Sequence, residues 1–423
     1  MAFAEERQLE SDYVMGTYAR KPVELVHGRG MTVYDDEGNA YRDFVAGVGA
    51  VSLGHCHPAV VSAVREQAER LIHVSNYYYI QNRGEVARML SDLLDARVPA
   101  ERRQGWQSFF ANSGAEANEC AIKLARLYAR KRCAATPDAA PDAPAGTPAP
   151  DADAPRLIVT LDGSFHGRTL ATLAATAQPA KQESFQPLPG GFVSTPINDI
   201  DALERLFADL GGQVCAVMVE CVQGESGVHP CTAEFLAAAR RLTAECGALL
   251  ICDEIQCGIY RCGTYPFGFQ HFGIEPDIVT IAKGVASGFP TGMCAARRDV
   301  AAAFAPGDHG STFGGSCLAV AAARATLEAL AEEGIADRVE ETGAYLRERL
   351  AALPQVAQVR GLGLMVAADL ADGAPAAPAV VDAALKEGLL LNATGPRTLR
   401  FLPPLVCSKA DIDDLIGKLA LLL

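Results

Sequence analysis

The chain alternates short apolar runs with longer amphipathic stretches over most of its length. Seven apolar runs of four to six residues predict buried strands. Helical periodicity lies between most of them; Ala117, Ala121, Leu124 and Tyr128, for example, fall on one face of a helix. This alternation predicts an α/β fold with a mainly parallel, doubly wound sheet. The predicted strands are Trp106 to Ala111, Leu157 to Leu161, Phe192 to Thr195, Val214 to Val219, Ala248 to Cys252, Ile278 to Ala282 and Gly292 to Ala296.

The two ends of the chain depart from this pattern. Near the amino end, residues 30–44 carry two alternating runs around an acidic, Gly-containing turn, which predicts a hairpin. In the last quarter of the chain the strand runs thin out and helices dominate, at 318–333 and 339–353. A mixed segment at 356–368 precedes a terminal helix, which Ser408 caps.

Two domains, or one large domain with an appendage, are expected, because 423 residues are too many for one compact core. We place a large domain at 58–310 and a smaller α+β domain at 311–423, to which the segment 1–57 contributes. An Ala/Pro/Asp tract at 134–155 interrupts the large domain. This tract cannot bury enough apolar surface to offset its ordering entropy, so we expect a mobile, disorder-like surface insertion without a catalytic part.

Charge and hydropathy narrow the choice of partners and location. The net charge of −14 argues against nucleic acid or an anionic membrane as a partner, so anionic substrates must meet local Arg side chains. No uninterrupted apolar stretch approaches the roughly 18 residues of a membrane helix. The amino terminus lacks the basic-then-apolar pattern of a signal peptide. We therefore expect a cytoplasmic protein.

The cysteines predict neither a disulfide framework nor a zinc site. The chain has 13 of them, with no C-x-x-C pair, and most lie inside apolar runs. The sequence His55-Cys56-His57 is a possible metal motif, but the flanking Gly54 and Pro58 favour a loop that enters a helix. We expect no metal site.

Two polar residues come at the ends of neighbouring predicted strands: Asp253 follows one apolar run and Lys283 follows the next. In open α/β sheets, ligands bind beyond the carboxyl ends of the strands. An acid and an amine at one edge of one sheet can hold a pyridine ring and an aldehyde, as pyridoxal phosphate chemistry requires. Alone, either residue would more often be a helix cap or a solvated side chain.

Other predicted strands are also followed by residues that can bind a ligand. Ser113 and Gly114 open a helix whose amino terminus can bind an anion, although an ordinary helix cap would have the same sequence. Phe165 can lie flat against a planar ring, and Arg168 can form a forked contact with a carboxylate. His166 either lines the site or supports its loop.

Further candidates lie in Gly-rich loops. Glu220 and Glu225 follow the fourth predicted strand, and Gln256 follows Asp253 by three positions. Ser311 and Thr312 add hydroxyl groups in a loop that ends in two glycines.

Together these segments resemble the class III pyridoxal-phosphate aminotransferases, most closely the acetylornithine aminotransferases. The resemblance runs from about Tyr13 to the end, interrupted mainly by the Ala/Pro/Asp tract. It implies a fold type I transferase with a mainly parallel seven-stranded sheet, a smaller α+β domain, and a homodimer with shared active sites. The motifs that carry it are Gly54-His55-Cys56-His57-Pro58, Asn112-Ser113-Gly114-Ala115-Glu116-Ala117-Asn118, Phe165-His166-Gly167-Arg168, Asp253-Glu254-Ile255-Gln256, Ala282-Lys283, Ser311-Thr312-Phe313-Gly314-Gly315 and Arg400-Phe401.

The resemblance also implies how the cofactor, pyridoxal 5′-phosphate, is bound. Lys283 would bind its aldehyde and later carry a proton between substrate and cofactor, Asp253 would pair with the pyridine nitrogen, and Gln256 with the ring hydroxyl. Thr312 would reach the phosphate from the neighbouring subunit. The full cofactor set is Ser113, Gly114, Ala115, Phe165, Glu220, Asp253, Gln256, Lys283 and Thr312.

For substrates, the resemblance assigns Arg168 to the α-carboxylate of the donor, with Ser311 nearby. Arg400 would bind the α-carboxylate of glutamate. We infer a switch in which Glu225 masks Arg400 while a terminal-amine donor is bound and swings away for glutamate. Tyr18 either lines the substrate entrance or packs the amino-terminal segment.

The implied reaction moves the 5-amino group of N2-acetylornithine to 2-oxoglutarate, giving N-acetylglutamate 5-semialdehyde and glutamate, in arginine biosynthesis. Alternatives within the class are ornithine, succinylornithine, succinyl-diaminopimelate, 4-aminobutyrate and diaminobutyrate aminotransferases. An alternative of another class is a cofactor-binding regulator without turnover; such a protein would not need the carboxylate switch. Cys221, Ser226 and the stretch Tyr260–Gly263 depart from the common family pattern without removing a catalytic group.

Overall fold

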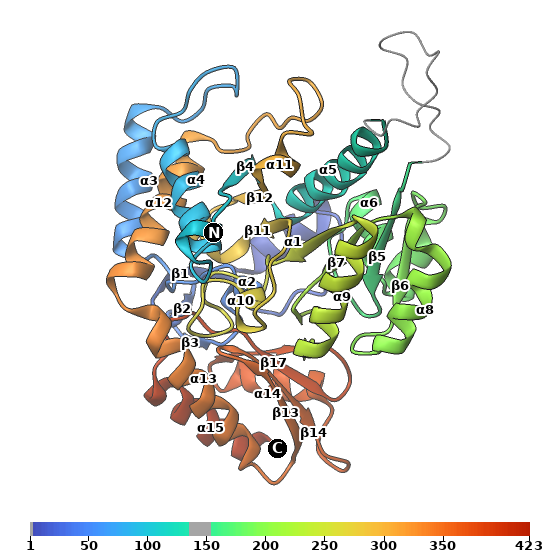
Figure 1. Cartoon of the computed structure of the whole chain (residues 1–423). Helices are drawn as coiled ribbons and strands as arrows, with labels where there is room; N and C mark the ends of the chain where they lie inside the picture. Colours follow the sequence, from blue (N-terminus) through green and yellow to red (C-terminus); the bar gives the residue numbers. More distant parts are fainter. Residues whose placement is uncertain (1–2, 135–153) are drawn as a thin grey trace.

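The computed structural model describes residues 3–134 and 154–423. The predicted insertion at 134–155 therefore lies almost entirely outside the described residues. A large central sheet with helices on both faces forms one part of the molecule, and the carboxy-terminal helices and strands gather at one end of it (Figure 1).

The central sheet has seven strands and confirms the predicted α/β fold. Strand β12 runs antiparallel to both of its neighbours, and the other strand pairs of the sheet are parallel. Asp253 is the last residue of β10 and lies opposite Thr280, so this strand begins and ends one residue later than predicted. In spatial order the strands are β4 (Trp106–Ala111), β12 (Gly292–Arg297), β11 (Ile278–Ile281), β10 (Leu249–Asp253), β7 (Val214–Val219), β5 (Leu157–Leu161) and β6 (Phe192–Thr195).

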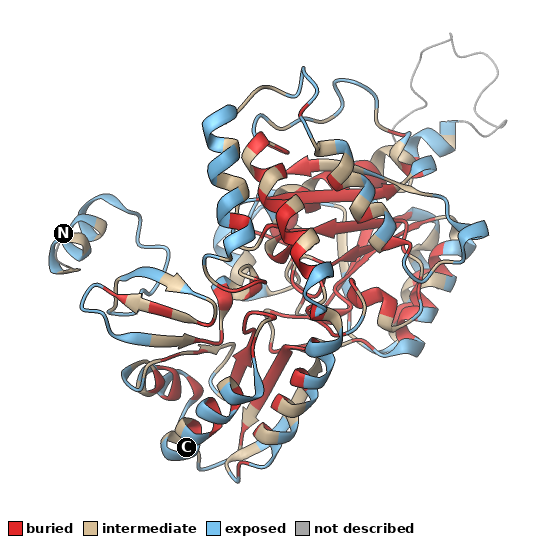
Figure 2. Cartoon of the chain, turned by 90° about the vertical axis from the view of Figure 1, so that its left-hand side faces the viewer, coloured by how far each residue is buried: buried red, intermediate tan, exposed pale blue. Residues whose placement is uncertain are grey.

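Apolar side chains on both faces of this sheet make the core. All residues of β7 are buried; Ala216 and Met218 belong to the cluster that includes α5 (Gly114–Ala134), and Val217 and Val219 to the cluster that includes α9 (Ala233–Cys246). Because alternate residues of a strand point to opposite faces, one apolar run serves both helix layers. Figure 2 shows the buried strands between helices with exposed outer surfaces.

Smaller sheets surround the central one. The predicted hairpin is present as β2 (Thr32–Asp35) and β3 (Ala40–Asp43), and β3 also pairs with β15 (Leu389–Leu390) from near the other end of the chain. The remaining strands are β1 (Leu25–Arg29) beside β2, the sheet β13 (Val356–Leu362), β14 (Met365–Leu370), β17 (Thr398–Phe401) and β16 (Asn392–Ala393), and the pair β8 (Val222–Gln223) and β9 (His229–Pro230).

The helix predicted at 318–333 is present within one residue, whereas the one predicted at 339–353 begins four residues earlier, at Ile335. Ser408 caps the last helix by accepting a hydrogen bond from the Asp411 N–H. Within residues 3–134 and 154–423, no helix is both long and apolar enough to cross a membrane. The helices not yet named are α1 (Phe3–Tyr13), α2 (Ala46–Gly49), α3 (Pro58–Arg70), α4 (Arg83–Leu94), α6 (Leu170–Ala175), α7 (Pro179–Gln182), α8 (Ile200–Leu210), α10 (Gly268–His271), α11 (Arg298–Ala301), α12 (Cys317–Glu332), α13 (Ile335–Ala351), α14 (Ala377–Lys386) and α15 (Lys409–Leu422).

The two histidines of the His55-Cys56-His57 motif hold the loop before α3. His55 Nε2 lies 2.8 Å from Asp43 Oδ2, and His57 Nε2 lies 2.9 Å from Glu333 Oε1. Each imidazole is thus engaged by a different carboxylate. In the described part of the chain, no group of three or more His, Cys, Asp or Glu side chains is arranged to hold a metal ion.

Candidate active site

The carboxyl ends of β10 and β11 meet at one edge of the central sheet. The two strands are parallel neighbours, so Asp253 at the end of β10 and Lys283, two residues beyond β11, reach the same cavity of about 380 Å³. The cavity is lined by Ala50, Asn112, Ser113, Gly114, Ala115, Phe165, His166, Gly167, Arg168, Glu220, Asp253, Ile255, Gln256, Ala282, Lys283, Gly288, Phe289, Pro290 and Thr291.

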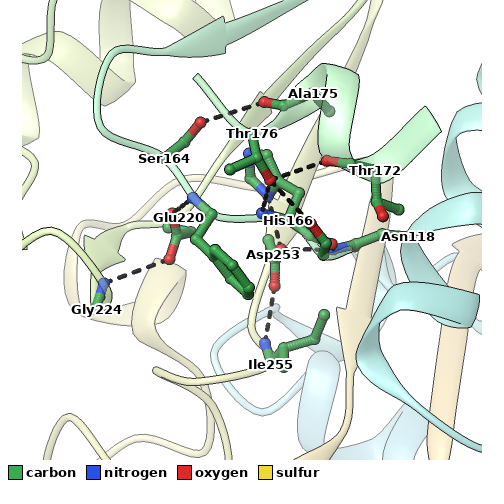
Figure 3. A network of polar contacts seen from close by, with 12 residues as sticks. Asn118, Ser164, His166, Thr172, Ala175, Thr176, Glu220, Gly224, Asp253 and Ile255 are labelled. Atoms are coloured by element: carbon green, nitrogen blue, oxygen red, sulfur yellow. Dashed lines mark hydrogen bonds and ion pairs between the residues drawn. The ribbon is translucent and has the colours of Figure 1, made fainter. Parts of the chain in front are cut away.

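Asp253 is held by a buried network of polar groups (Figure 3). Its Oδ2 accepts a hydrogen bond from Asn118 Nδ2 at 2.8 Å and contacts His166 Nδ1 at 2.7 Å, and its Oδ1 accepts one from the Ile255 N–H at 3.1 Å. Burial lowers the pKa of His166, but the hydrogen bond and negative charge of Asp253 outweigh burial and raise it. The pair therefore favours an imidazolium that donates to a carboxylate.

Lys283 is half-buried and has a left-handed backbone, with φ of 47°. Such a conformation is costly for a residue with a side chain and is typical of functional sites. Burial lowers the pKa of its ammonium group, and the positive charge of Arg400 adds to this, while Glu225 and Asp253 oppose it. The site thus favours the neutral amine more than water does.

Glu220 follows β7, is buried, and lines the cavity. Its Oε2 accepts the Phe165 N–H at 2.8 Å, and its Oε1 accepts the Gly224 N–H at 3.3 Å. Burial raises the pKa of this carboxyl to about 7, against the opposing charge of His166. Glu220 thus joins the Phe165 loop to the loop that carries Glu225.

Arg400 on β17 reaches the site from a different sheet. Its Nη1 lies 2.8 Å from Glu225 Oε1 and donates to the Gly224 carbonyl at 2.9 Å, while its Nε donates to Asn392 at 3.0 Å. Burial alone would raise the pKa of Glu225, but the charge and hydrogen bond of Arg400 lower it. Gln256 contacts both partners, donating to Glu225 at 3.2 Å and accepting from Arg400 at 3.3 Å.

The first turn of α5 and the Phe165 loop form the remaining wall. Gly114 packs so closely on Ile255 that a Cβ atom there would lie 2.8 Å from Ile255 Cδ1. Ser113 Oγ accepts the Glu116 N–H at 3.2 Å, as in an ordinary helix cap. Arg168 is exposed and lies over the Phe165 ring, with 5.6 Å between its Cζ and the ring centroid.

Five of the predicted site residues do not line the cavity within the single chain. Glu225 and Arg400 form the ion pair that contacts Gln256 at the border of the cavity. Ser311 lies next to the cavity, where its Oγ accepts a hydrogen bond from Asn112 Nδ2 at 3.2 Å. Thr312 is exposed, and Tyr18 is 79% exposed. The roles assigned to them stay predictions.

Comparison with known proteins places this geometry in a family. The model of the family "Aminotransferase class-III" matches residues 15–423. The chain belongs to this family. The aminotransferase is 45% identical over 411 residues to acetylornithine aminotransferase of Caldanaerobacter subterraneus subsp. tengcongensis, covering 96% of this chain and 95% of the relative.

Solved structures give the same picture of this aminotransferase. Acetylornithine aminotransferase from Elizabethkingia anophelis has a TM-score of 0.81 and 30% identity, covering 99% of this chain and 98% of the other. Ornithine aminotransferase from Toxoplasma gondii, crystallised with oxidised glutathione, has a TM-score of 0.85 and 31% identity, covering 99% and 93%, and pyridoxal phosphate partially occupies its active site.

The aminotransferase also has site residues that sequence reasoning missed. Asn118 contacts Asp253 and also donates to the His166 carbonyl at 2.7 Å. The available signal was its place on α5, one turn after Gly114, on the side that meets the sheet edge. Lys181 lies 5.9 Å from the centroid of the Phe165 ring, and it had no signal because it lies outside the family motifs.

Proposed function

We propose that this aminotransferase uses pyridoxal phosphate to move the 5-amino group of N2-acetylornithine to 2-oxoglutarate, in arginine biosynthesis. The Glu225–Arg400 ion pair carries the proposal, because Gln256 connects it to the cavity that Lys283 and Asp253 line. The carbon that bears the 5-amino group has no carboxylate, whereas the reacting carbon of glutamate has one. An arginine that a glutamate can mask serves both substrates. The names of the relatives support acetylornithine as the donor.

The residues around the cavity fit the cofactor. Pyridoxal phosphate supplies an electron sink for the substrate carbanion. Asp253 Oδ1 accepts the Ile255 N–H and has acceptor capacity left for a protonated ring nitrogen. The first turn of α5, at Gly114 and Ala115, offers backbone N–H groups and a positive dipole end to a phosphate. Phe165 supplies an aromatic face for the ring.

Lys283 would act as the proton carrier. A lysine side chain in water has a pKa of about 10.5, and burial lowers the pKa of Lys283 in the folded protein. Its Nζ can then bind the cofactor aldehyde and, once free, take up and return a proton at the reacting carbon. Arg could not do this, because it keeps its proton at working pH.

The active unit would be a homodimer in which Thr312 reaches the phosphate site of the other subunit. Exposed aromatic side chains support this proposal: Tyr77 is 93%, Tyr79 103% and Phe313 60% exposed. The loop that carries Tyr77 also holds the Thr312 loop, since Asn76 Nδ2 donates to the Ser311 carbonyl at 2.8 Å. Sedimentation velocity tests the proposal, and a monomer that is fully active at assay concentration would refute it.

A panel of amino donors assayed with 2-oxoglutarate tests the function. We expect the highest kcat/KM for acetylornithine; a clear preference for 4-aminobutyrate would overturn the choice of donor. Acetylornithine alone should bleach the visible absorbance of the bound cofactor, and 2-oxoglutarate should restore it. Lys283→Ala should abolish turnover. Bound cofactor with no bleaching by any amino donor would favour the regulator without turnover.

A further inference from the structure

Glu220 connects the loop that carries Phe165 to the loop that carries Glu225. It is 4% exposed, and its two carboxylate oxygens accept the backbone N–H groups of Phe165 and Gly224. A carboxylate oxygen only accepts hydrogen bonds, so the ionised side chain satisfies both N–H groups at once. Glu220 therefore connects the two loops, and it also lines the cavity.

The first of these loops serves the cofactor. The Phe165 N–H bond to Glu220 is 2.8 Å long. The next residue, His166, contacts Asp253 at 2.7 Å. Glu220 thus fixes the backbone at Phe165, next to the residue that contacts Asp253.

The second loop serves the Glu225–Arg400 pair. The Gly224 N–H binds Glu220 at 3.3 Å, and the Gly224 carbonyl accepts Arg400 Nη1 at 2.9 Å. There is no spare room at this position, because a Cβ at Gly224 would lie 1.7 Å from Gln256 Oε1. Glu220 therefore holds the peptide from which Glu225 reaches Arg400.

We propose that Glu220 is a positioning residue that keeps the Glu225–Arg400 pair closed and so sets the balance between the terminal-amine donor and glutamate. The inference rests on the proposed function. Without the bond to Gly224, the Glu225 backbone is held less firmly and its contact with Arg400 weakens. Arg400 then becomes more available to the α-carboxylate of glutamate. The preference of the enzyme for the terminal-amine donor over glutamate therefore falls.

The charge state of Glu220 supports this role. Burial raises its pKa to about 7, the charge of His166 opposes this, and Asp253 adds to it. The Cys231 thiol also faces Glu220, and its Sγ donates to the Glu220 carbonyl at 3.5 Å. A protonated Glu220 accepts less well from Gly224, so the balance should move toward glutamate as the pH falls through about 7.

Glu220→Gln tests the role directly. An amide has one acceptor oxygen, so one of the two backbone N–H groups loses its partner. Each half-reaction is measured separately, with acetylornithine or glutamate as the only substrate. We expect the ratio of kcat/KM for acetylornithine to that for glutamate to fall about tenfold, equivalent to about 1.4 kcal/mol. The change should include a lower KM for glutamate.

Glu254→Gln is the matched control. Glu254 is also fully buried, also accepts two backbone N–H groups, from Gly268 at 2.7 Å and Phe269 at 2.8 Å, and its pKa is likewise raised by burial to about 7. Its bonds lead away from the cavity. This variant should lower Tm as Glu220→Gln does while leaving the ratio unchanged. An unchanged ratio in Glu220→Gln, or an equal shift in Glu254→Gln, would overturn the inference.

A pH series on the unaltered enzyme needs no variant and covers the case in which Glu220→Gln fails to fold. The ratio should fall between pH 8 and pH 6, and a flat ratio would count against Glu220. The same native measurements separate the two proposals. If native enzyme does not use acetylornithine, the proposed donor is wrong, and the ratio measured with the donor it does use still tests Glu220.

Discussion

The two ends of the candidate active site are built in different ways. At the cofactor end, Asp253, His166 and Asn118 are each at most 2% exposed and come from segments at one edge of the central sheet. At the switch end, Arg400 comes from a separate sheet, and the side chain of its partner Glu225 is 25% exposed. The first pair is almost fully buried, whereas the carboxylate of the second is partly exposed, as the proposed exchange of one carboxylate for another requires. A fixed network thus suits the cofactor, and an accessible ion pair suits a site with two substrates.

The largest effect is expected from Asp253→Asn, which keeps the side-chain shape and removes its charge. A pyridine nitrogen that loses about two pKa units of stabilisation loses about 2.7 kcal/mol, or about a hundredfold in rate. Both half-reactions should fall together, because both need the same electron sink. Rapid-mixing measurements of each half-reaction check this.

Asp277→Asn is the matched control for that change. Asp277 is a buried acid beside the same sheet that accepts the Leu250 N–H at 2.8 Å and pairs with Arg240 at 2.7 Å. It should lower stability without affecting either half-reaction in the folded protein. Unequal losses in the two half-reactions of Asp253→Asn would contradict the picture of a shared, fixed cofactor end.

The contrast between the two ends also explains what the sequence could predict. Apolar runs identify the inner strands of the central sheet because these strands are buried on both faces, as β7, β10 and β11 are. Asp253 and Lys283 could be brought together from sequence because parallel neighbours deliver their carboxyl ends to one edge. The family resemblance, rather than periodicity, suggested the pairing of Glu225 with Arg400, which are 175 positions apart.

Contacts made by side chains across the fold could not be predicted in this way. Asn118 and His166 bind Asp253 across 135 and 87 positions, and neither spacing follows a local rule. Gln256 was assigned to the cofactor from its motif, yet its amide contacts the Glu225–Arg400 pair. These details depend on side-chain rotamers and on packing between sheets, which hydrophobic periodicity does not encode.

Arg400→Ala should separate the two half-reactions. Removing one partner of a buried, hydrogen-bonded charge pair costs about 2–5 kcal/mol, so we expect the glutamate half-reaction to lose at least about thirtyfold in kcat/KM. The acetylornithine half-reaction should lose much less, because in the proposed switch Glu225 masks Arg400 in that half. Arg400→Lys should recover part of the loss, because lysine keeps the positive charge but cannot make the forked contact of a guanidinium group with a carboxylate. Equal losses in both halves would remove the basis for a switch.

The smallest effect concerns Glu254, a buried carboxylate that, within the described chain, is paired with neither a histidine nor an arginine. Asp253 is balanced by His166, and Glu225 by Arg400, whereas Glu254 is stabilised by the N–H groups of Gly268 and Phe269. Burial raises its pKa from 4.5 to about 7. The folded state then binds more protons than the unfolded state between these values, so this contribution to stability is full below pH 4.5 and is lost as the pH rises through about 7.

Glu254→Gln removes this dependence. From pH 5 to pH 8, the stability advantage of the unaltered protein over the variant should shrink by up to about 3 kcal/mol in the free energy of unfolding. Urea unfolding of both proteins at the two pH values measures the difference. An advantage that stays constant would mean that Glu254 remains ionised in the folded protein throughout. In that case the two backbone N–H groups and the Cys257 thiol would balance a buried carboxylate as well as His166 and Arg400 do at the two ends of the site.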